Sequence, residues 1–194
     1  MNPKAIPILK EEQNIRTILE GCKRGDRKAQ DQLYTQFYRY ALGICIRYTR
    51  SQEEAFEVVN DGFYKIMANA DKYVPGLSFK GWVRKIMINA SIDNFRRNEK
   101  HYDNVDISYV KTEQLTPDVL SSLSEEVIIK ALQQLPPSYQ IVFNLHAIEG
   151  YQHDEIAQKL NISVGTSKSN LNVARAKLKK ALSLEFDKKA EQHG

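Results

Sequence analysis

The sequence has little cysteine and no long apolar run, and both absences exclude classes of protein. Its 194 residues include only two cysteines, Cys22 and Cys45. They lie in apolar helical patterns without paired spacing, so we expect buried thiols and not a disulfide or a metal site. No apolar stretch is long enough to span a membrane, and the apolar cluster at the start, which Pro7 and Lys10 interrupt, is not a secretory signal. We therefore expect a cytoplasmic protein without membrane insertion.

Catalytic and metal-binding patterns are missing as well. The four histidines, His101, His146, His153 and His193, lack metal-ligand spacing. The sequence contains no phosphate-binding glycine motif, no nucleophile elbow and no evident pair of catalytic carboxylates. No segment alternates between apolar and polar residues for long enough to predict a strand. These absences predict an all-α protein with no metal, no cofactor and no enzymatic activity.

The charge is small overall but strongly segregated along the chain. The net charge is +4, yet residues 51–62 hold four acids and no base. Residues 84–100 hold five bases against two acids, and residues 101–126 hold six acids and one lysine. Such blocks of opposite sign indicate separate surfaces for separate partners.

The last third of the chain has the pattern of a helix-turn-helix. Pro136-Pro137 ends one helix and starts the next, which should turn Tyr139, Val142, Phe143 and His146 to one side and end at Gly150. A short helix follows with Asp154 and Glu155 in its first turn. Asn161 suits a left-handed turn, and Ser163 is a good N-cap for the last helix. This order of elements is typical of a unit that reads duplex DNA.

The last helix has an apolar face and a basic face. From residue 161 to residue 184 it carries five basic residues and no acid. A solvated lysine face is the simpler explanation of an isolated basic helix, but the preceding two-helix unit favours DNA contact. We predict that the helix start reads bases through Ser167, Lys168, Ser169, Asn170 and Asn172. We predict that Arg175, Lys177 and Lys179 hold phosphates.

The first hundred residues predict a separate helical module. Asp26 and the Ser51–Glu54 capping box mark two helix starts, and Ser78 marks a third after the Pro75-Gly76 loop. In the helix after Ser78, Trp82 belongs to an apolar stripe. Another face of this helix carries a polar row made of Lys85, Asn89, Asp93 and Arg96, with Arg97 beside it. Such a row suits nucleic-acid contact, although it is more often a solvated face.

The two modules should be joined by a flexible linker. Residues 98–124 are polar, acidic and interrupted by Pro117, with almost no helical periodicity. We therefore predict an N-terminal helical domain at 1–97, a linker at 98–124, a helix-turn-helix domain at 125–185 and a charged tail at 186–194. Two DNA-binding modules on a loose tether can span two separated sites on one duplex.

The chain resembles the extracytoplasmic-function group of bacterial sigma factors from about Gly25 to Leu182. The first half carries Gly25-Asp26-Arg27-Lys28-Ala29 with Leu33-Tyr34, the acidic stretch Glu54 to Phe63, and Ser78-Phe79 with Trp82, Asn89, Asp93 and Arg96-Arg97. The second half carries Leu135-Pro136, Val142-Phe143, Glu155-Ile156-Ala157, Leu160, Ile162-Ser163 and Gly165-Thr166. All these pieces occur in the family's order and spacing.

The resemblance implies an RNA polymerase subunit that recognises promoters and helps to melt them. By that resemblance, Glu54, Glu57, Asn60 and Asp61 bind the core polymerase. The helix of Asn89 and Asp93 reads the −10 element together with Lys80, Lys85, Arg96 and Arg97, and the loop before it captures a flipped base. The C-terminal helix-turn-helix reads the −35 element. An anti-sigma factor is a further expected partner, and the free protein is expected to be a monomer.

Two other interpretations stay open at this point. A helix-turn-helix repressor or activator would bind a palindromic duplex site unaided as a dimer. A pure interaction protein, such as a decoy for a regulator, would leave the polar row and the basic helix without a use.

Overall fold

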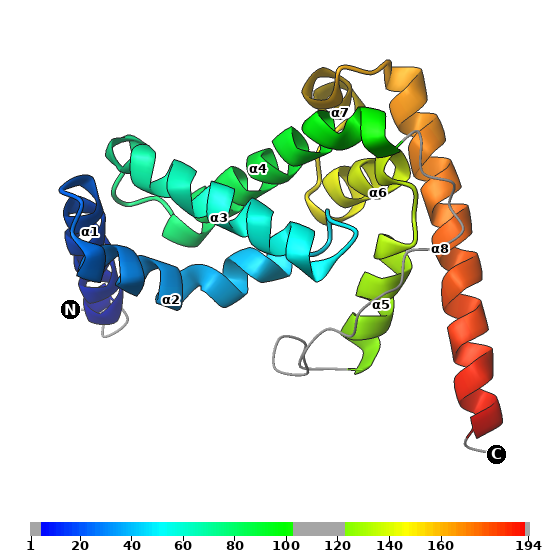
Figure 1. Cartoon of the computed structure of the whole chain (residues 1–194), viewed down its shortest axis with the longest axis horizontal. Helices are drawn as coiled ribbons and strands as arrows, with labels where there is room; N and C mark the ends of the chain where they lie inside the picture. The colour runs from blue at the N-terminus through cyan, green and yellow to red at the C-terminus, as the bar shows by residue number, and fades with distance from the viewer. Residues whose placement is uncertain (1–4, 103–122, 193–194) are drawn as a thin grey trace.

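The computed structural model describes the backbone of residues 5–102 and 123–192, and the side chains of residues 12–98 and 125–183 (Figure 1). Within these ranges every regular element is a helix, which confirms the all-α prediction. None of the described helices combines the length and the apolarity that a membrane crossing requires.

The N-terminal half consists of four long helices. They are α1 (Ala5–Lys23), α2 (Arg27–Cys45), α3 (Gln52–Ala68) and α4 (Phe79–Tyr102), with a short 3₁₀ turn at Ala70–Lys72. Figure 1 shows α2, α3 and α4 running side by side, while α1 crosses their far end. The three predicted caps are confirmed: Asp26 Oδ1 accepts from the N–H of Lys28, Ser51 Oγ from Glu54 and Ser78 Oγ from Gly81.

Apolar stripes from α2, α3 and α4 meet to form the core of this half. Leu33, Phe63, Val83 and Met87 are among its most buried side chains. Gly62 is also buried and lies against the end of Met87. Because a glycine has no side chain, the backbones of α3 and α4 can approach closely at this point.

The C-terminal half consists of α5 (Leu123–Gln133), α6 (Pro137–Phe143), α7 (His153–Leu160) and α8 (Val164–Gln192). Between α6 and α7 the chain forms one π-helical turn, Asn144–Ile148. The wider turn rotates the following side chains away from the positions that a 3.6-residue period predicts. Val142 is buried together with Ile141 and Leu145, whereas Tyr139, Phe143 and His146, which were predicted to share its side of the helix, are half-buried.

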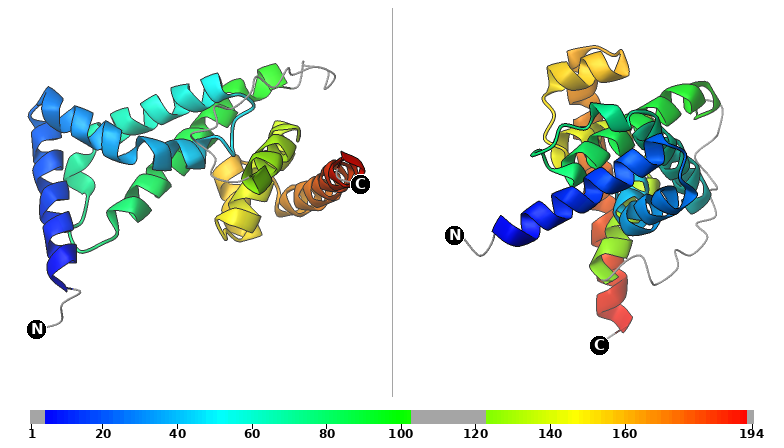
Figure 2. Two further views of the ribbon diagram at one scale, coloured as in Figure 1. Left: turned by 90° about the horizontal axis from the view of Figure 1, so that it is seen from below. Right: turned by 90° about the vertical axis from the view of Figure 1, so that its left-hand side faces the viewer.

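The two halves are packed against each other, in contrast to the predicted loose tether. Helix α4 contacts both α6 and α7, and one apolar cluster includes core residues of both halves (Figures 1 and 2). The helices also extend beyond the predicted boundaries, since α4 reaches Tyr102, α5 starts at Leu123 and α8 continues to Gln192. The linker predicted to be flexible spans residues 98–124, of which 103–122 lie outside the described part of the chain.

Candidate nucleic-acid and protein interfaces

The start of α8 is held in place by local backbone chemistry. Asn161 adopts the left-handed conformation with φ of 55°, and Ser163 Oγ accepts a hydrogen bond from the N–H of Thr166 at 2.9 Å. Both features were predicted from the sequence. Leu171, Ala174 and Leu178 are buried on one face of the helix. The opposite face of α8 is thereby fixed toward solvent.

Most of the predicted DNA-contact residues lie on that opposite face. The exposed members are Lys168, Ser169, Asn172, Arg175, Lys177 and Lys179. Asn170 is half-buried. The exposed side chains place four positive charges along one helix without an intervening acid, which is the arrangement that phosphate contacts require.

Ser167 departs from the prediction, because its side chain is fully buried. Its Oγ lies 2.9 Å from Nδ1 of His153, and the His153 ring stacks on His146 with 4.5 Å between the ring centroids. His146 Nδ1 in turn donates to the carbonyl of Tyr151 at 2.9 Å. Ser167 thus joins α8 to α7 inside the domain, and it cannot read a base from this position.

The predicted polar row of α4 is surface-accessible at its start and paired at its end. Lys85 is exposed and Asn89 is half-buried, and Lys80, which precedes the row, is exposed as well. Asp93 accepts a hydrogen bond from Lys65 Nζ at 2.6 Å and lies 3.9 Å from the Arg96 guanidinium. These side chains are 37 to 48% exposed. Exposed pairs of this kind contribute at most about 1 kcal/mol, so a ligand can exchange with them.

The two arginines at the end of the row have different partners. Arg96 donates to the carbonyl oxygen of Lys159, at the C-terminal end of α7. Arg97 forms an ion pair of 2.8 Å with Asp61 on α3. One arginine therefore links the two halves of the protein, and the other links the predicted polymerase-binding helix to the predicted −10 helix.

The four predicted polymerase-binding residues on α3 do not form one uniform surface. Glu57 and Asn60 are exposed and Asp61 is half-exposed. Glu54 is used within the fold, since its carboxylate accepts from the N–H of Arg50 at 2.8 Å and from Asn94 Nδ2 at 2.6 Å. Glu54 is therefore less available to a partner than the other three.

A hollow lies beside the predicted base-capturing loop. Its volume is about 420 Å³, within the range of small-molecule sites. Glu12 and Ile15 of α1 and Phe37 of α2 form one side, and the loop contributes Tyr73 and residues 76–80. The loop thus borders a space that α1 helps to shape, which the sequence did not predict.

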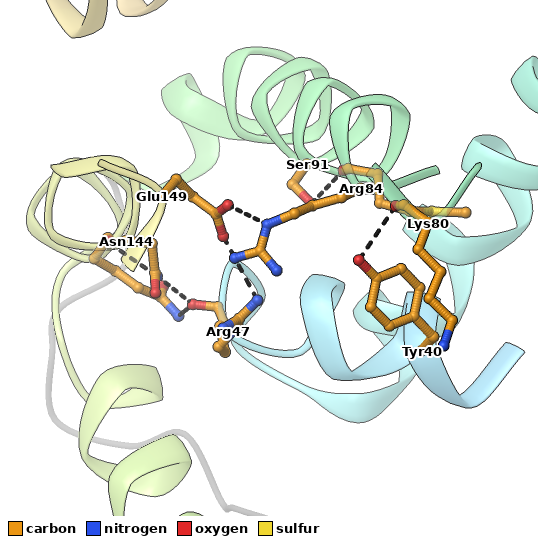
Figure 3. Close-up of polar contacts among 9 residues, drawn as sticks. Tyr40, Arg47, Lys80, Arg84, Ser91, Asn144 and Glu149 are labelled. Atoms are coloured by element: carbon orange, nitrogen blue, oxygen red, sulfur yellow. Dashed lines mark hydrogen bonds and ion pairs between the residues drawn. The ribbon is translucent and has the colours of Figure 1, made fainter. Parts of the chain in front are cut away.

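The contact between the two halves contains polar residues that were not predicted from the sequence. Glu149 accepts from Arg84 Nε at 2.6 Å and lies 3.6 Å from the Arg47 guanidinium (Figure 3). Asn144 Nδ2 donates to the carbonyl of Arg47 at 2.6 Å, and Gln140 Nε2 donates to the carbonyls of Arg47 and Thr49 at 3.0 and 3.2 Å. The sequence does contain one indication of this contact: two amide residues, Gln140 and Asn144, lie four residues apart in an otherwise apolar segment. Amide side chains are mostly exposed in folded proteins, so a buried pair indicates hydrogen-bond partners elsewhere in the chain.

Comparisons with known proteins match both halves. Residues 33–101 match the family described as sigma-70 region 2, and residues 125–178 match sigma-70 region 4. The RNA polymerase sigma-H factor of Pseudomonas aeruginosa is 25% identical, over 90% of this chain and 96% of its own length. The ECF RNA polymerase sigma factor SigW of Bacillus subtilis is 27% identical, over 88% of this chain and 98% of its own.

A solved structure supports the fold independently. The sigma factor RpoE from Bartonella quintana, crystallised with the anti-sigma factor NepR, superimposes with a TM-score of 0.52 at 22% identity, over 79% of this chain and 96% of its own. The two sigma-70 regions follow each other along the chain, one in each half, and the relatives match over almost their whole length. The chain therefore belongs to the sigma-70 family and is a sigma factor of the extracytoplasmic-function group.

Proposed function

We propose that this sigma factor directs core RNA polymerase to its promoters through three surfaces on three different helices. The carboxylates of α3 bind the polymerase, α4 binds the −10 element, and α8 binds the −35 element. The protein acts in the cytoplasm with the polymerase, which performs the catalysis. The observation that carries the proposal is the separation of charge: acidic side chains are exposed on α3 and basic ones on α8.

The polymerase-binding surface consists of Glu57, Asn60 and Asp61. Glu57 and Asp61 lie four residues apart and therefore share a face of α3. Asn60 already accepts a hydrogen bond from the Tyr34 hydroxyl at 3.1 Å, so its amide has a fixed orientation. Glu54 supports this surface from inside the fold, because it ties the start of α3 to Asn94 of α4.

The two DNA-binding surfaces have different chemistry. On α8, Lys168, Ser169, Asn170 and Asn172 lie near the helix start and read base edges, while Arg175, Lys177 and Lys179 hold phosphates. On α4, Lys80, Lys85 and Asn89 contact the −10 element, and Asp93, Arg96 and Arg97 join them after exchanging their present partners. The hollow beside residues 76–80 accepts the flipped base, which offsets part of the cost of unstacking.

An anti-sigma factor is the further partner that we propose. RpoE of Bartonella quintana, which shares this fold, was solved in complex with the anti-sigma factor NepR. A similar inhibitor would hold the present protein away from the polymerase until it is released.

Run-off transcription tests the proposal directly. Purified core polymerase, with and without this protein, is supplied with a library of random promoter DNA. We expect enriched transcripts whose templates share two spaced elements. Transcription that does not depend on the protein, together with binding of a palindromic site by a dimer of the protein alone, would instead establish the repressor class.

Charge-reversal variants then assign the surfaces. Glu57→Lys should abolish transcription by preventing polymerase binding, whereas Asp31→Lys, the same change at an exposed site of α2, should not. Lys168→Ala should alter the preferred upstream sequence. Lys180→Ala is the matched control, because Lys180 lies about 120° around α8 from Lys168. Replacing Lys179 should lower the salt dependence of upstream binding by about one unit of slope.

A further inference from the structure

The first helix, α1, carries none of the three proposed binding surfaces, yet it borders the hollow that is proposed to accept the flipped base. The region 2 match begins only at residue 33, so it assigns no role to this helix. Ile15 and Leu19 bury one face of α1 and hold the helix against α2. This packing brings Glu12, about one turn before Ile15, to the hollow beside residues 76–80.

The wall of the hollow is held by hydrogen bonds within the protein. The Tyr73 hydroxyl donates to the carbonyl of Leu77 at 2.7 Å, which closes the loop on itself. Where the loop enters α4, the Tyr40 hydroxyl donates to the carbonyl of Lys80 at 3.2 Å (Figure 3). The Phe79 ring packs edge-on against the Tyr73 ring, with 5.2 Å between the ring centroids. A ligand therefore meets a prearranged site, and little free energy of binding is spent on ordering it.

The lining of the hollow suits a nucleobase. Its volume is about 420 Å³, and Phe37, Tyr73 and Phe79 contribute aromatic surface to it. Bases of single-stranded DNA stack on aromatic side chains. Lys80 also borders the hollow and is exposed, so its ammonium group can hold the phosphate of the captured nucleotide. The hydrogen-bonding edge of the base still needs a polar partner.

Among the described residues that line the hollow, Glu12 supplies the only carboxylate. It is half-buried, and no described residue donates a hydrogen bond to it or lies within ion-pair distance of it. Burial, and after it the nearby Glu12 charge, raise the pKa of the Tyr73 hydroxyl. Because that hydroxyl already donates to Leu77, the carboxylate keeps its acceptor capacity for a ligand.

We infer that Glu12 selects the base that enters the hollow, favouring a base with an amino group on its Watson–Crick edge over thymine. This inference rests on the proposed function. A flipped base is read through hydrogen bonds to its Watson–Crick edge. An ionised carboxylate only accepts hydrogen bonds, and the amino groups of cytosine, adenine and guanine donate to it. Thymine instead presents a carbonyl oxygen on each side of its one N–H, and these oxygens repel a carboxylate.

The random promoter library reports this preference position by position. Transcription by core polymerase is measured with the unaltered protein, with Glu12→Gln and with Glu20→Gln. With the unaltered protein, one position of the downstream element should be depleted of thymine at least about fivefold. Glu12→Gln should admit thymine at that position alone, because an amide also donates to a carbonyl oxygen. Glu20→Gln is the matched control, since it makes the same change at an exposed site about two turns further along α1.

A binding measurement distinguishes a direct contact from an effect on the fold. The probe is a fluorescent single strand carrying the identified −10 element, and the protein is assembled with core polymerase. A second strand carries, at the selected position, the same base without its amino group, such as pyrimidin-2-one in place of cytosine. Loss of the amino group should weaken binding at least about fivefold for the unaltered protein and should have little effect for Glu12→Ala.

The outcomes separate this inference from the proposed function. If Glu12→Gln leaves the base preference unchanged at every downstream position, or if loss of the amino group weakens Glu12→Ala and the unaltered protein equally, the role of Glu12 is refuted while the proposed function stands. A uniform loss of transcripts with the base preference retained would make Glu12 a structural residue and would also refute it. If none of the proteins enriches two spaced elements, the proposed function itself fails.

Discussion

Gly62 offers a quantitative test of how α3 and α4 are held together. A methyl group at this position would lie 2.3 Å from Sδ and 2.8 Å from Cε of Met87. Met87 is itself fully buried, so the end of its side chain cannot move into open space. The pair matters for function because α3 carries the proposed polymerase surface and α4 carries the proposed −10 row.

The expected effect of Gly62→Ala is the difference between two opposing contributions. Alanine favours a helix over glycine by about 1 kcal/mol. Forcing an extra methyl group into a filled core costs about 1–3 kcal/mol. Gly43→Ala provides the control, since Gly43 is also helical but exposed, and among the described residues no atom lies within 4 Å of the added carbon. Gly62→Ala should therefore be less stable than Gly43→Ala by about 1–3 kcal/mol.

Urea unfolding followed by tryptophan fluorescence measures this difference. The protein has a single tryptophan, Trp82, which lies on α4 with its ring near Tyr73 and Phe79. Met87→Val removes both clashing atoms, so Gly62→Ala should be tolerated in that background. The double-mutant cycle should show a favourable coupling of at least about 1 kcal/mol. Equal effects of the two glycine substitutions, or a coupling near zero, would refute the argument.

Three further predictions concern single residues. Ser163→Ala removes the acceptor of the Thr166 N–H and should destabilise the C-terminal half by about 1 kcal/mol, as measured by thermal unfolding. An unchanged midpoint would show that another group caps α8. Partial burial and the neighbouring His146 lower the pKa of His153. The unfolded chain therefore binds a proton at this histidine more readily than the folded protein does, and the free energy of unfolding should fall as the pH drops below about 6.5. The midpoint of urea unfolding, measured at several pH values, should show this loss of stability. If the midpoint of His153→Gln depends on pH in the same way, a group other than His153 is responsible. Burial raises the pKa of the Cys45 thiol to about 12, so a thiol reagent at neutral pH should modify Cys45 only after unfolding. Mass spectrometry measures this labelling, and rapid labelling of Cys45 in the folded protein would contradict the prediction.

The helix starts and turns could be predicted from the sequence because their causes are local. The caps at Asp26, Ser51 and Ser163 and the left-handed turn at Asn161 depend on side chains within three residues of the backbone groups that they satisfy. The face of α8 was likewise predictable from its period, and the same period places Ser167, four residues before Leu171, on the buried face, although Ser167 was predicted to read bases. At that position the side chain finds a partner in His153, fourteen residues away, and the sequence alone does not show this contact.

The arrangement of the halves could not be predicted, because it depends on contacts between residues far apart in the chain. The bond from Arg84 to Glu149 spans 65 residues, and the bond from Asn144 to the Arg47 carbonyl spans 97. The π-helical turn that follows α6 was not predicted either. The N–H of Glu149 bonds to the carbonyl of Asn144, five residues before it, so Glu149 points in a different direction from the one that a regular helical period would give.

The length of α8 has a practical consequence for experiments on this protein. The region 4 match ends at residue 178, but the helix continues to Gln192. Fourteen residues of α-helix extend about 21 Å. A fluorophore or fusion partner attached at the C-terminal end would therefore sit on a stiff arm, away from the DNA-facing side chains at the start of α8. Its rotation would follow that of the whole domain, which makes this end a suitable place from which to observe the sigma factor as it joins and leaves the polymerase.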